Sequence, residues 1–438
     1  MEMTKDLLRV KETEGRGRAL VAAQPLRGGQ IVLRDSPILL YSALPLISPS
    51  LHPYCNHCFK TLKQPQPQAA GSSACVCPWC SHHAFCSSNC LSSALSYSHS
   101  PWVCQALCRL RDSPSPLSDQ PLERQVQARF LIAAYNLAIV SPSNFQMLLS
   151  LQGQPDDSAA SDTTAAAHFL HCLISSLCAP PPSLQEQQLF SVELSAALLA
   201  KDKLNAFGLM EPFSETSQRS SRAYAIYPKA SFFNHDCLPN ACRFDYVDAD
   251  GDRNTDMVVR MIHDVPAGRE ICLSYFPVNQ SYSSRQRTLA EDYGFACQCD
   301  RCKVEANWSD NEENIEGEEE AEGMDEDQDQ EMEAASESEP ESGSDIEEAQ
   351  AQVESDFPHA YFFLSFMCNR TNCWGTLAPL PPKDDGTPSN VMECNVCGNL
   401  KKDEEINGHE AFGETMGVNR QQQSFKVCAP ITWRDHML

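Results

Sequence analysis

The sequence predicts an α+β protein whose β-rich domain is interrupted by two inserted pieces. Strand-like segments lie at 18–41 and return at 223–276, with apolar and β-branched runs between turn-forming residues. A cysteine-rich stretch at 55–108 and a region with helical periodicity at 121–206 separate these segments. The two sets of strands are therefore expected to form one domain, which a zinc-binding module and a helical insertion interrupt.

The first strands are expected at 18–41 as an antiparallel hairpin, because the letters RALVAAQPLRGGQIVLRDSPILLY place Pro-Leu-Arg-Gly-Gly between two apolar flanks. The later strands are expected at AYAIY, CRFDYVDAD, DMVVRMI and REICLSYF. Helices are expected at ERQVQARFLIAAYNLAIV, AAAHFLHCLISSLC, LQEQQLFSVELSAALLAKDKL and, after the last strand, SSRQRTLAEDYGF. The stretch QGQPDDSAASDTTAAA between the first two helices is expected to be an exposed loop.

The cysteines indicate zinc sites rather than disulfides. The chain has 22 Cys. Its first residues lack the apolar core of a signal peptide, and no run reaches the ~18 apolar residues of a membrane-spanning helix. The protein is therefore expected inside the cell, where thiols stay reduced and Cys pairs at ligand spacing bind metal.

Eight ligands between residues 55 and 104 predict two closed, structural zinc sites, because each tetrahedral zinc takes four nitrogen or sulfur ligands. Three Cys pairs at ligand spacing are followed by one His and one Cys. These ligands are Cys55, Cys58, Cys77, Cys80, Cys86, Cys90, His99 and Cys104. Four neighbours are alternative ligands: Cys75, His82, His83 and Cys108.

Two more cysteine groups lie further along the chain. The first supplies three thiolates, so a closed site needs a fourth ligand from earlier in the chain. Its members are Cys297, Cys299 and Cys302. The second is typical of a four-Cys zinc ribbon, with reduced structural thiols as the alternative. Its members are Cys368, Cys373, Cys394 and Cys397.

The net charge of −26 is concentrated in one segment. Residues 310–356 contain 22 acidic residues and no Lys or Arg. Such a segment repels itself and has little apolar surface, so 309–356 is expected to be a disordered linker. Residues 357–438 recover apolar content and are expected to fold. The rest of the chain lacks the clustered basic residues of a nucleic-acid-binding surface, which argues against direct nucleic-acid binding.

Four motifs occur in the order and nearly the spacing of a known family. They are GRGRALVAAQPLRGGQIVL, AIYPKASFFNHDCLPNA, VPAGREICLSY and YGFACQCDRC. With the inserted zinc module they resemble the SET-and-MYND protein-lysine methyltransferases, and among these the plant Ash-related SET-domain proteins. The resemblance covers residues 12–304. It implies a split SET domain over 5–280, a MYND-type finger over 55–104, a helical insertion over 105–206 and a post-SET zinc segment over 281–304. Beyond the linker, the four-Cys set by itself predicts a zinc-ribbon-like region over 357–438.

The resemblance also implies site residues and cofactors. It implies S-adenosyl-L-methionine in contact with Gly17, Arg18, Asn205, Asn234, His235, Tyr275 and Phe295, with Tyr275 as the catalytic residue. It implies that Cys237 is the fourth ligand beside Cys297, Cys299 and Cys302. Within the finger it assigns Cys55, Cys58, Cys86 and Cys90 to one zinc, and Cys77, Cys80, His99 and Cys104 to the other.

The implied reaction needs an aligned, neutral lysine amine rather than a strong base. A lysine with a pKa of about 10.4 must fall by roughly three units, which is about 4 kcal/mol. Two cations about 6 Å apart at an effective dielectric of about 20 repel by about 2.8 kcal/mol, so the sulfonium charge supplies most of this shift. Desolvation in a narrow channel supplies the rest. The Tyr275 hydroxyl is then expected to orient the amine.

The expected function is methylation of a lysine in a protein substrate, with histones as the expected substrate and the nucleus and chromosome, or else the cytoplasm, as the location. One alternative is an interaction protein whose MYND module binds Pro-rich partners while its SET domain is weakly active or inactive. A cross-brace ubiquitin ligase would also use eight zinc ligands, but it leaves the SET motifs unexplained. The acidic segment is expected to act as a spacer, with binding of basic histone tails as the alternative.

Overall fold

The computed structural model describes residues 7–46, 53–62, 75–112, 116–117, 119–153, 160–178, 190–216, 219–249, 254–306, 365–383 and 386–402. The expected acidic linker, 309–356, lies outside the described residues, and so do both ends of the expected C-terminal region, 357–364 and 403–438. Within the described part of the chain, no helix is long and apolar enough to cross a membrane.

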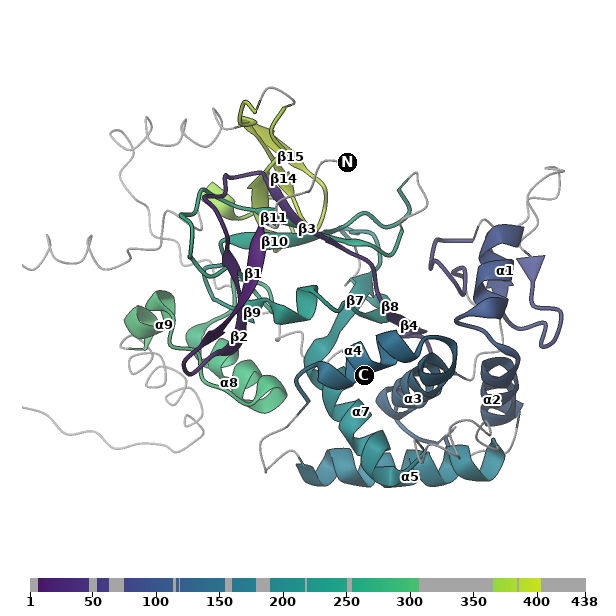
Figure 1. Cartoon of the computed structure of the whole chain (residues 1–438). Helices are drawn as coiled ribbons and strands as arrows, with labels where there is room; N and C mark the ends of the chain where they lie inside the picture. Colours follow the sequence, from purple (N-terminus) through teal and green to yellow (C-terminus); the bar gives the residue numbers. More distant parts are fainter. Residues whose placement is uncertain are drawn as a thin grey trace, which may run out of the picture.

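The β-rich domain consists of small sheets, and one of them joins a strand from near the start of the chain to strands from residues 241–261 (Figure 1). Strand β1 (Leu8–Thr13) pairs with β2 (Gly17–Ala22), and both are antiparallel. Strand β3 (Ile31–Asp35) joins β10 (Ala241–Asp245) and β11 (Met257–Met261) in the order β10-β11-β3. The interrupted β-rich domain predicted from the sequence is therefore present.

The hairpin predicted at 18–41 is wrong, although its two strands exist. Strand β2 pairs with β1, and β3 pairs with β11. The connection between β2 and β3 contains a turn, in which the N–H of Gln30 donates to the carbonyl of Arg27 at 3.0 Å, but the residue before this turn pairs elsewhere. Leu26 and Val265 exchange two backbone hydrogen bonds of 3.0 and 2.9 Å. A segment more than 200 residues away thus satisfies backbone groups that a tight turn would have paired internally.

A second sheet carries the helical insertion. It contains β4 (Leu39–Ser42), β8 (Ser221–Ile226) and β7 (Ala206–Met210), in that order. The helices of the insertion pack below it in Figure 1: α2 (Pro101–Asp112), α3 (Leu122–Val140), α4 (Pro142–Ser150), α5 (Ala160–Leu177) and α7 (Val192–Asn205). Most of α3 is buried, and the rings of Phe130 and Tyr41 lie 5.3 Å apart, so insertion and sheet share one core.

The exposed loop predicted between the first two helices of the insertion is too long. Helix α5 begins at Ala160, so half of the predicted loop is helical. Ala166 and Ala167 are buried in the core that the insertion shares with the sheet. Alanine has the highest helix propensity, so the Thr-Thr-Ala-Ala-Ala run extends the helix rather than ending it.

The cysteine-rich finger, residues 53–62 and 75–104, is fastened to the strands beside it. It contains β5 (Cys75–Val76), β6 (Ala84–Phe85) and α1 (Ser88–Ser96). The buried guanidinium of Arg222, on β8, donates to the carbonyl of Phe59 (2.8 Å) and pairs with Asp248 (3.2 Å). Asp248 in turn accepts from the backbone N–H of Thr61 (2.9 Å). This buried arginine therefore holds the finger in a set position against the domain.

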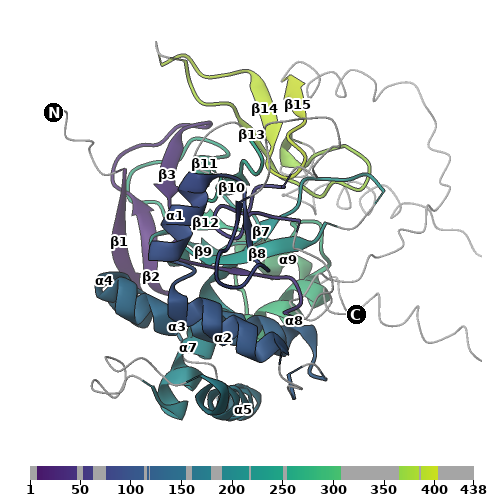
Figure 2. The same ribbon diagram turned by 90° about the vertical axis from the view of Figure 1, so that its right-hand side faces the viewer.

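A small C-terminal sheet packs against β10 and β11, as Figures 1 and 2 both show. It consists of β13 (Leu377–Pro379), β14 (Val391–Cys394) and β15 (Leu400–Lys402). Arg260 is 1% exposed, lies 3.7 Å from the ring centroid of Phe244 and donates to Glu393 at 2.8 Å. Gly29 packs closely against the same module. A side chain at this position would place its Cβ only 2.4 Å from the carbonyl oxygen of Leu380.

Breaking the Arg260–Glu393 ion pair is expected to loosen the C-terminal module. Glu393→Ala should cost about 3 kcal/mol of stability, because it leaves a buried guanidinium without its anion. Thermal unfolding and limited proteolysis of the module measure this loss. The matched control is Glu215→Ala, which removes the exposed partner of Arg370 and should cost about 1 kcal/mol or less. Equal effects of the two changes would contradict a buried role for Glu393.

Candidate active site and metal centres

The active-site candidates meet where two short parallel strands lie side by side. Strand β9 (Asn234–His235) follows a 3-10 turn, η1 (Ala230–Phe232), and pairs with β12 (Cys272–Leu273). The register sets Asn234 opposite Cys272 and His235 opposite Leu273. The strand pair therefore brings the Asn-His motif close to Tyr275, which follows β12 directly.

His235 is 2% exposed, and both of its ring nitrogens are engaged. Its Nδ1 accepts a hydrogen bond from the backbone N–H of Tyr275 at 3.1 Å. Burial lowers the pKa of His235 to about 3, so the imidazole is neutral. Because Nδ1 accepts, the ring proton lies on Nε2, which is 3.2 Å from the sulfur of Cys237. The ring thus connects the Tyr275 segment to a cysteine cluster.

The Tyr275 side chain is held at both ends. Its hydroxyl donates to the carbonyl of Phe233 at 2.9 Å, and its ring lies 5.2 Å from the ring of His235. Burial raises the pKa of Tyr275 above its usual value, so the hydroxyl keeps its proton. With that proton directed at Phe233, the lone pairs of the oxygen are left to accept from another donor.

A charged cluster beside β9 was not identified from the sequence. Arg16 forms an ion pair with Glu270 (3.1 Å) and donates to the carbonyl of His235 (3.0 Å). The side-chain amide of Asn234 donates to Glu270 at 2.9 Å and to the carbonyl of Arg16 at 3.3 Å. The Gly-Arg-Gly sequence at residues 15–17 could have drawn attention to Arg16, but no sequence pattern linked this arginine to a glutamate 254 residues later.

Glycines open the chain at the same place. Gly17 has φ of +66° and Gly15 has φ of +72°, a left-handed region that favours glycine. A Cβ added to either residue would project into open space, with no heavy atom within 4 Å. The backbone between β1 and β2 is therefore accessible to close approach by a ligand.

Helix α8 (Tyr282–Tyr293) supplies the aromatic side of the site. It ends at Gly294, whose φ of +74° lets its N–H donate to Ala290 and that of Phe295 donate to Leu289. This reversal brings the Phe295 ring within 6.5 Å of His235, where it is 39% exposed. The Tyr293 ring, which was not predicted, lies 4.8 Å from Tyr275.

Two predicted cofactor residues, Arg18 and Asn205, direct their polar groups to the end of α4. Arg18 donates to the carbonyl of Ser150 (2.9 Å), and Asn205 donates to that of Gln152 (2.7 Å). Lys201 donates to the carbonyl between them, Leu151, at 2.7 Å. The carbonyl of Ser150 is one that a helix end leaves without an intrahelical partner, and the other two belong to the residues that follow α4. A cofactor contact of Arg18 or Asn205 remains a prediction.

The structure gathers Cys and His side chains into four clusters of four residues each. Each residue offers one ligand atom, and the four ligand atoms of a cluster lie within 4.8 Å of one another. Cluster 1 is Cys55, Cys58, Cys86 and Cys90; cluster 2 is Cys77, Cys80, His99 and Cys104; cluster 3 is Cys237, Cys297, Cys299 and Cys302; cluster 4 is Cys368, Cys373, Cys394 and Cys397. All of these cysteines are free thiols. Each set equals one that the sequence and the family resemblance predicted.

The spacing within the clusters fits tetrahedral zinc. Zinc–sulfur bonds of about 2.3 Å require sulfur atoms about 3.8 Å apart. The sulfur–sulfur distances are 3.6 Å for Cys58–Cys86, 4.0 Å for Cys77–Cys104, 3.5 Å for Cys237–Cys302 and 3.7 Å for Cys368–Cys397. Four protein ligands leave no open coordination position, so these residues suit structural rather than catalytic zinc.

Cluster 2 has a second histidine at its edge. Nδ1 of His83 lies 3.2 Å from the sulfur of Cys80, while Nε2 of His99 lies 3.7 Å from it. The two imidazole rings are 4.3 Å apart. His99 belongs to the four-ligand set, and His83 stays an alternative ligand, as the sequence indicated.

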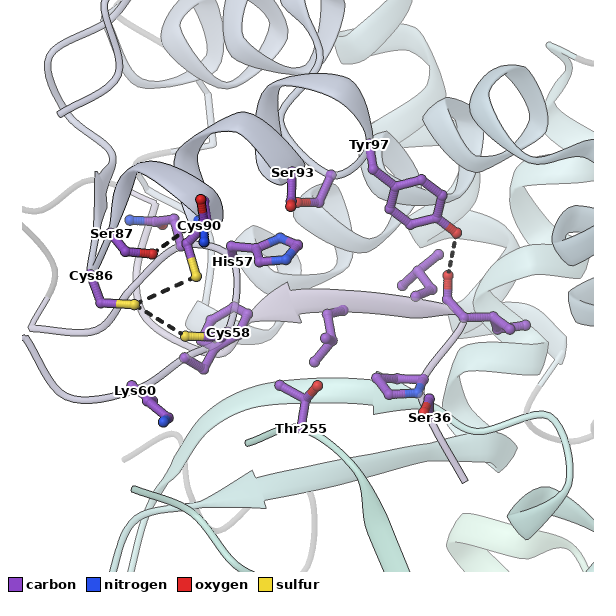
Figure 3. A pocket seen from close by; sticks show the side chains of 18 residues that line it. Ser36, His57, Cys58, Lys60, Cys86, Ser87, Cys90, Ser93, Tyr97 and Thr255 are labelled. Atoms are coloured by element: carbon purple, nitrogen blue, oxygen red, sulfur yellow. Dashed lines mark hydrogen bonds between the residues drawn. The ribbon is translucent and has the colours of Figure 1, made fainter. Parts of the chain in front are cut away.

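A groove of about 450 Å³ separates the finger from the β3–β4 connection (Figure 3). His57, Cys58 and Lys60 line one side of it, Ser93 and Tyr97 of the α1 region line another, and Ser36 and Thr255 lie opposite. The buried Nδ1 of His57 and Oγ of Ser98 have no hydrogen-bond partner among the described residues.

Comparison with known proteins agrees with this arrangement. The family model described as the SET domain matches residues 17–276. The chain belongs to the SET-domain family. Histone-lysine N-methyltransferase ASHR2 of Arabidopsis thaliana is 58% identical over 404 residues, which cover 91% of this chain and 96% of that protein. Histone-lysine N-methyltransferase ASHR1 of Arabidopsis thaliana is 26% identical over 67% of this chain and 55% of its own length.

A solved structure of the SET domain of LSMT bound to lysine and AdoHcy is more distant. It is 14% identical, has a TM-score of 0.30, and covers 68% of this chain and 54% of its own. The family assignment, together with the likeness to the Ash-related relatives, makes this SET-domain chain a protein-lysine N-methyltransferase that uses S-adenosylmethionine. The predicted family, fold class and enzyme class are confirmed.

Proposed function

We propose that the substrate lysine lies in a histone and that Tyr275 orients its amine for methyl transfer. The observation that carries the role of Tyr275 is its hydroxyl, whose proton is bound to the carbonyl of Phe233. An oxygen held in this way keeps its lone pairs in a fixed position, from which they can accept from an amine N–H. The histone substrate rests on the likeness to ASHR2, which is named a histone-lysine N-methyltransferase.

The cofactor would be held by groups at the β9–β12 junction. S-adenosylmethionine supplies a methyl group on a positive sulfonium. The accessible backbone at Gly17, the polar side chain of Asn234 and the partly exposed guanidinium of Arg16 suit its polar end. The exposed ring of Phe295 suits stacking on a flat base. Arg18 and Asn205 would contribute by fixing the end of α4 or by direct contact.

The reaction on this chain requires orientation rather than a base. His235 is neutral, and both its ring nitrogens are engaged by protein groups, so it does not abstract a proton. Tyr275 and Tyr293 pack with ring centroids 4.8 Å apart and can border an apolar channel. Such a channel disfavours the charged form of an entering amine, and the Tyr275 oxygen then aligns the neutral amine.

Four zinc ions are proposed as structural cofactors, two in the finger, one in cluster 3 and one in cluster 4. We further propose that the finger is of the MYND type, with the domain division 5–280, 55–104, 105–206, 281–304, 309–356 and 357–438. The nucleus and chromosome are the proposed location, because a histone substrate would be found there.

A second candidate function is binding of Pro-rich segments by the finger. The supporting observation is Trp79, which lies in the Cys77–Cys80 knuckle and is 53% exposed. An exposed aromatic surface of this kind is typical of proteins that bind proline-rich peptides. This function is compatible with catalysis by the SET domain.

One experiment tests the proposed substrate. The purified full chain is incubated with labelled S-adenosylmethionine and either a panel of single histones or a cell extract, and methylated lysines are mapped by mass spectrometry. A defined histone lysine should be methylated, and S-adenosylhomocysteine should raise the thermal unfolding temperature. Methylation of a non-histone extract protein alone would contradict the histone substrate. Binding of Pro-rich peptides without stabilisation by S-adenosylhomocysteine would favour the interaction function.

A further inference from the structure

The strongest unassigned contact near the active site is between a buried arginine and cluster 3. Arg285 lies on the first turn of α8 and is fully buried. Its Nε is 3.3 Å from the sulfur of Cys237, and its Nη2 is 3.7 Å from the sulfur of Cys302. Guanidinium groups carry only N–H donors, so both sulfurs are the acceptors.

Two further donors of this guanidinium bind oxygen atoms. Arg285 donates to the carbonyl of Gln280 at 2.7 Å and to Glu305 at 2.6 Å. Glu305 accepts a second bond from Arg301 at 2.6 Å. A buried cation is thus shared between a carboxylate and two thiols, which is the pairing that buried charge requires.

Charge explains why an arginine suits this position. Four thiolates around a divalent ion leave a net charge of −2, which is costly to bury. The Arg285, Arg301 and Glu305 side chains together contribute +1 next to the cluster. Hydrogen bonds to metal-bound thiolates also draw electron density from sulfur and so lower its reactivity toward electrophiles.

Cys237 links this cluster to the active site. Its sulfur receives one N–H from Arg285 and lies 3.2 Å from Nε2 of His235. His235 in turn accepts from the backbone of Tyr275. The helix that carries Arg285 at one end carries Tyr293 at the other, where its ring meets Tyr275.

We infer that Arg285 is a positioning residue of the active site, which acts by donating hydrogen bonds to the cluster 3 thiolates of Cys237 and Cys302. The inference rests on the zinc proposed for cluster 3. The guanidinium keeps these two thiolates bound and unreactive, and it thereby holds the end of β9 and helix α8 in register. Arg285 does not touch the reacting atoms.

The test replaces Arg285 with Met, which keeps the length of the stem and removes the donors. Glu305 retains Arg301 as its partner, so no buried carboxylate is left alone. The zinc of cluster 3 should leave for a chelator roughly 10- to 100-fold faster than in the unaltered chain. Iodoacetamide labelling, mapped peptide by peptide, should rise at Cys237 and Cys302 and stay unchanged at the other clusters. The KM for S-adenosylmethionine should rise more than kcat falls.

Two further variants separate this role from general packing. Arg287→Met alters an exposed arginine on the same helix and should leave zinc release and labelling unchanged. Arg285→Lys keeps the positive charge but has a single ammonium group in place of the guanidinium. Its zinc release and thiol labelling should therefore lie between those of the Met variant and the unaltered chain. It also provides the measurement if the Met variant does not fold.

The possible outcomes distinguish the role of Arg285 from the proposal that cluster 3 binds zinc. Protected thiols in the unaltered chain with no change in either Arg285 variant would overturn the role of Arg285 alone. Equal loss of zinc from all four clusters would also overturn it, because that pattern reports general unfolding. Rapid labelling of Cys237 and Cys302 in the unaltered chain would instead overturn zinc at cluster 3, and with it this inference.

Discussion

Replacing Tyr275 with Phe is expected to remove most methyl transfer while leaving cofactor affinity nearly unchanged. The phenyl ring keeps its packing against His235 and Tyr293, whereas the oxygen bound to the Phe233 carbonyl is lost. Loss of an orienting group lowers the fraction of aligned encounters, so the single-turnover rate should fall on the order of 100-fold. Rapid-quench single turnover and S-adenosylhomocysteine titration measure the two quantities separately.

The matched control for this change is Tyr246→Phe. Tyr246 is also a hydrogen-bonded tyrosine, with its hydroxyl 3.3 Å from Glu393, but it lies beside the C-terminal module and is 43% exposed. Its single-turnover rate should match that of the unaltered chain. A Tyr275→Phe variant that transfers methyl at the unaltered rate would refute the orienting role.

Replacing Cys237 with Ala is expected to have the second largest effect, because one residue belongs to a metal cluster and adjoins the active site. Three thiolates would remain in cluster 3, so the chain should bind one zinc fewer than the unaltered protein. The sulfur beside His235 would also be absent. Affinity for S-adenosylhomocysteine should therefore fall roughly tenfold or more, which is about 1.4 kcal/mol or more.

Metal analysis of the denatured protein and calorimetric titration measure these effects. Cys242→Ala is the control, since Cys242 is a buried thiol that belongs to none of the four clusters. It should keep all of its zinc and its cofactor affinity. If Cys237→Ala retained the zinc content of the control, Cys237 would not be a ligand.

The local parts of the site were predictable because they are encoded in short spacings. Two cysteines separated by two residues reach the same ion regardless of the surrounding fold, so the Cys77–Cys80 and Cys394–Cys397 pairs could be identified directly. The strands that flank the insertions were also visible in the sequence, because apolar and β-branched residues alternate there between turn formers.

Contacts between distant segments were not predictable from the residues alone. Glu270 and Tyr293 lie inside motifs that were visible in the sequence, but no pattern indicated which side chains they would meet. Those contacts, with Asn234 and with Tyr275, form only in the folded chain. The predicted hairpin failed for the same reason, since β2 and β3 each found a better partner elsewhere in the chain. Pairing of strands depends on which surfaces the whole chain can bury, and that information is not local.

By itself, the sequence determined the interrupted β-rich organisation, the Cys and His sets that the fold gathers into four clusters, and the family to which the chain belongs. Only the tertiary structure decided that Arg285 faces the Cys237 sulfur and that Arg260 joins the C-terminal module to β11. Both side chains are cations, for which a surface position is the ordinary expectation. They are buried because a carboxylate or a thiol from another segment meets each one, and such a meeting exists only in the folded chain.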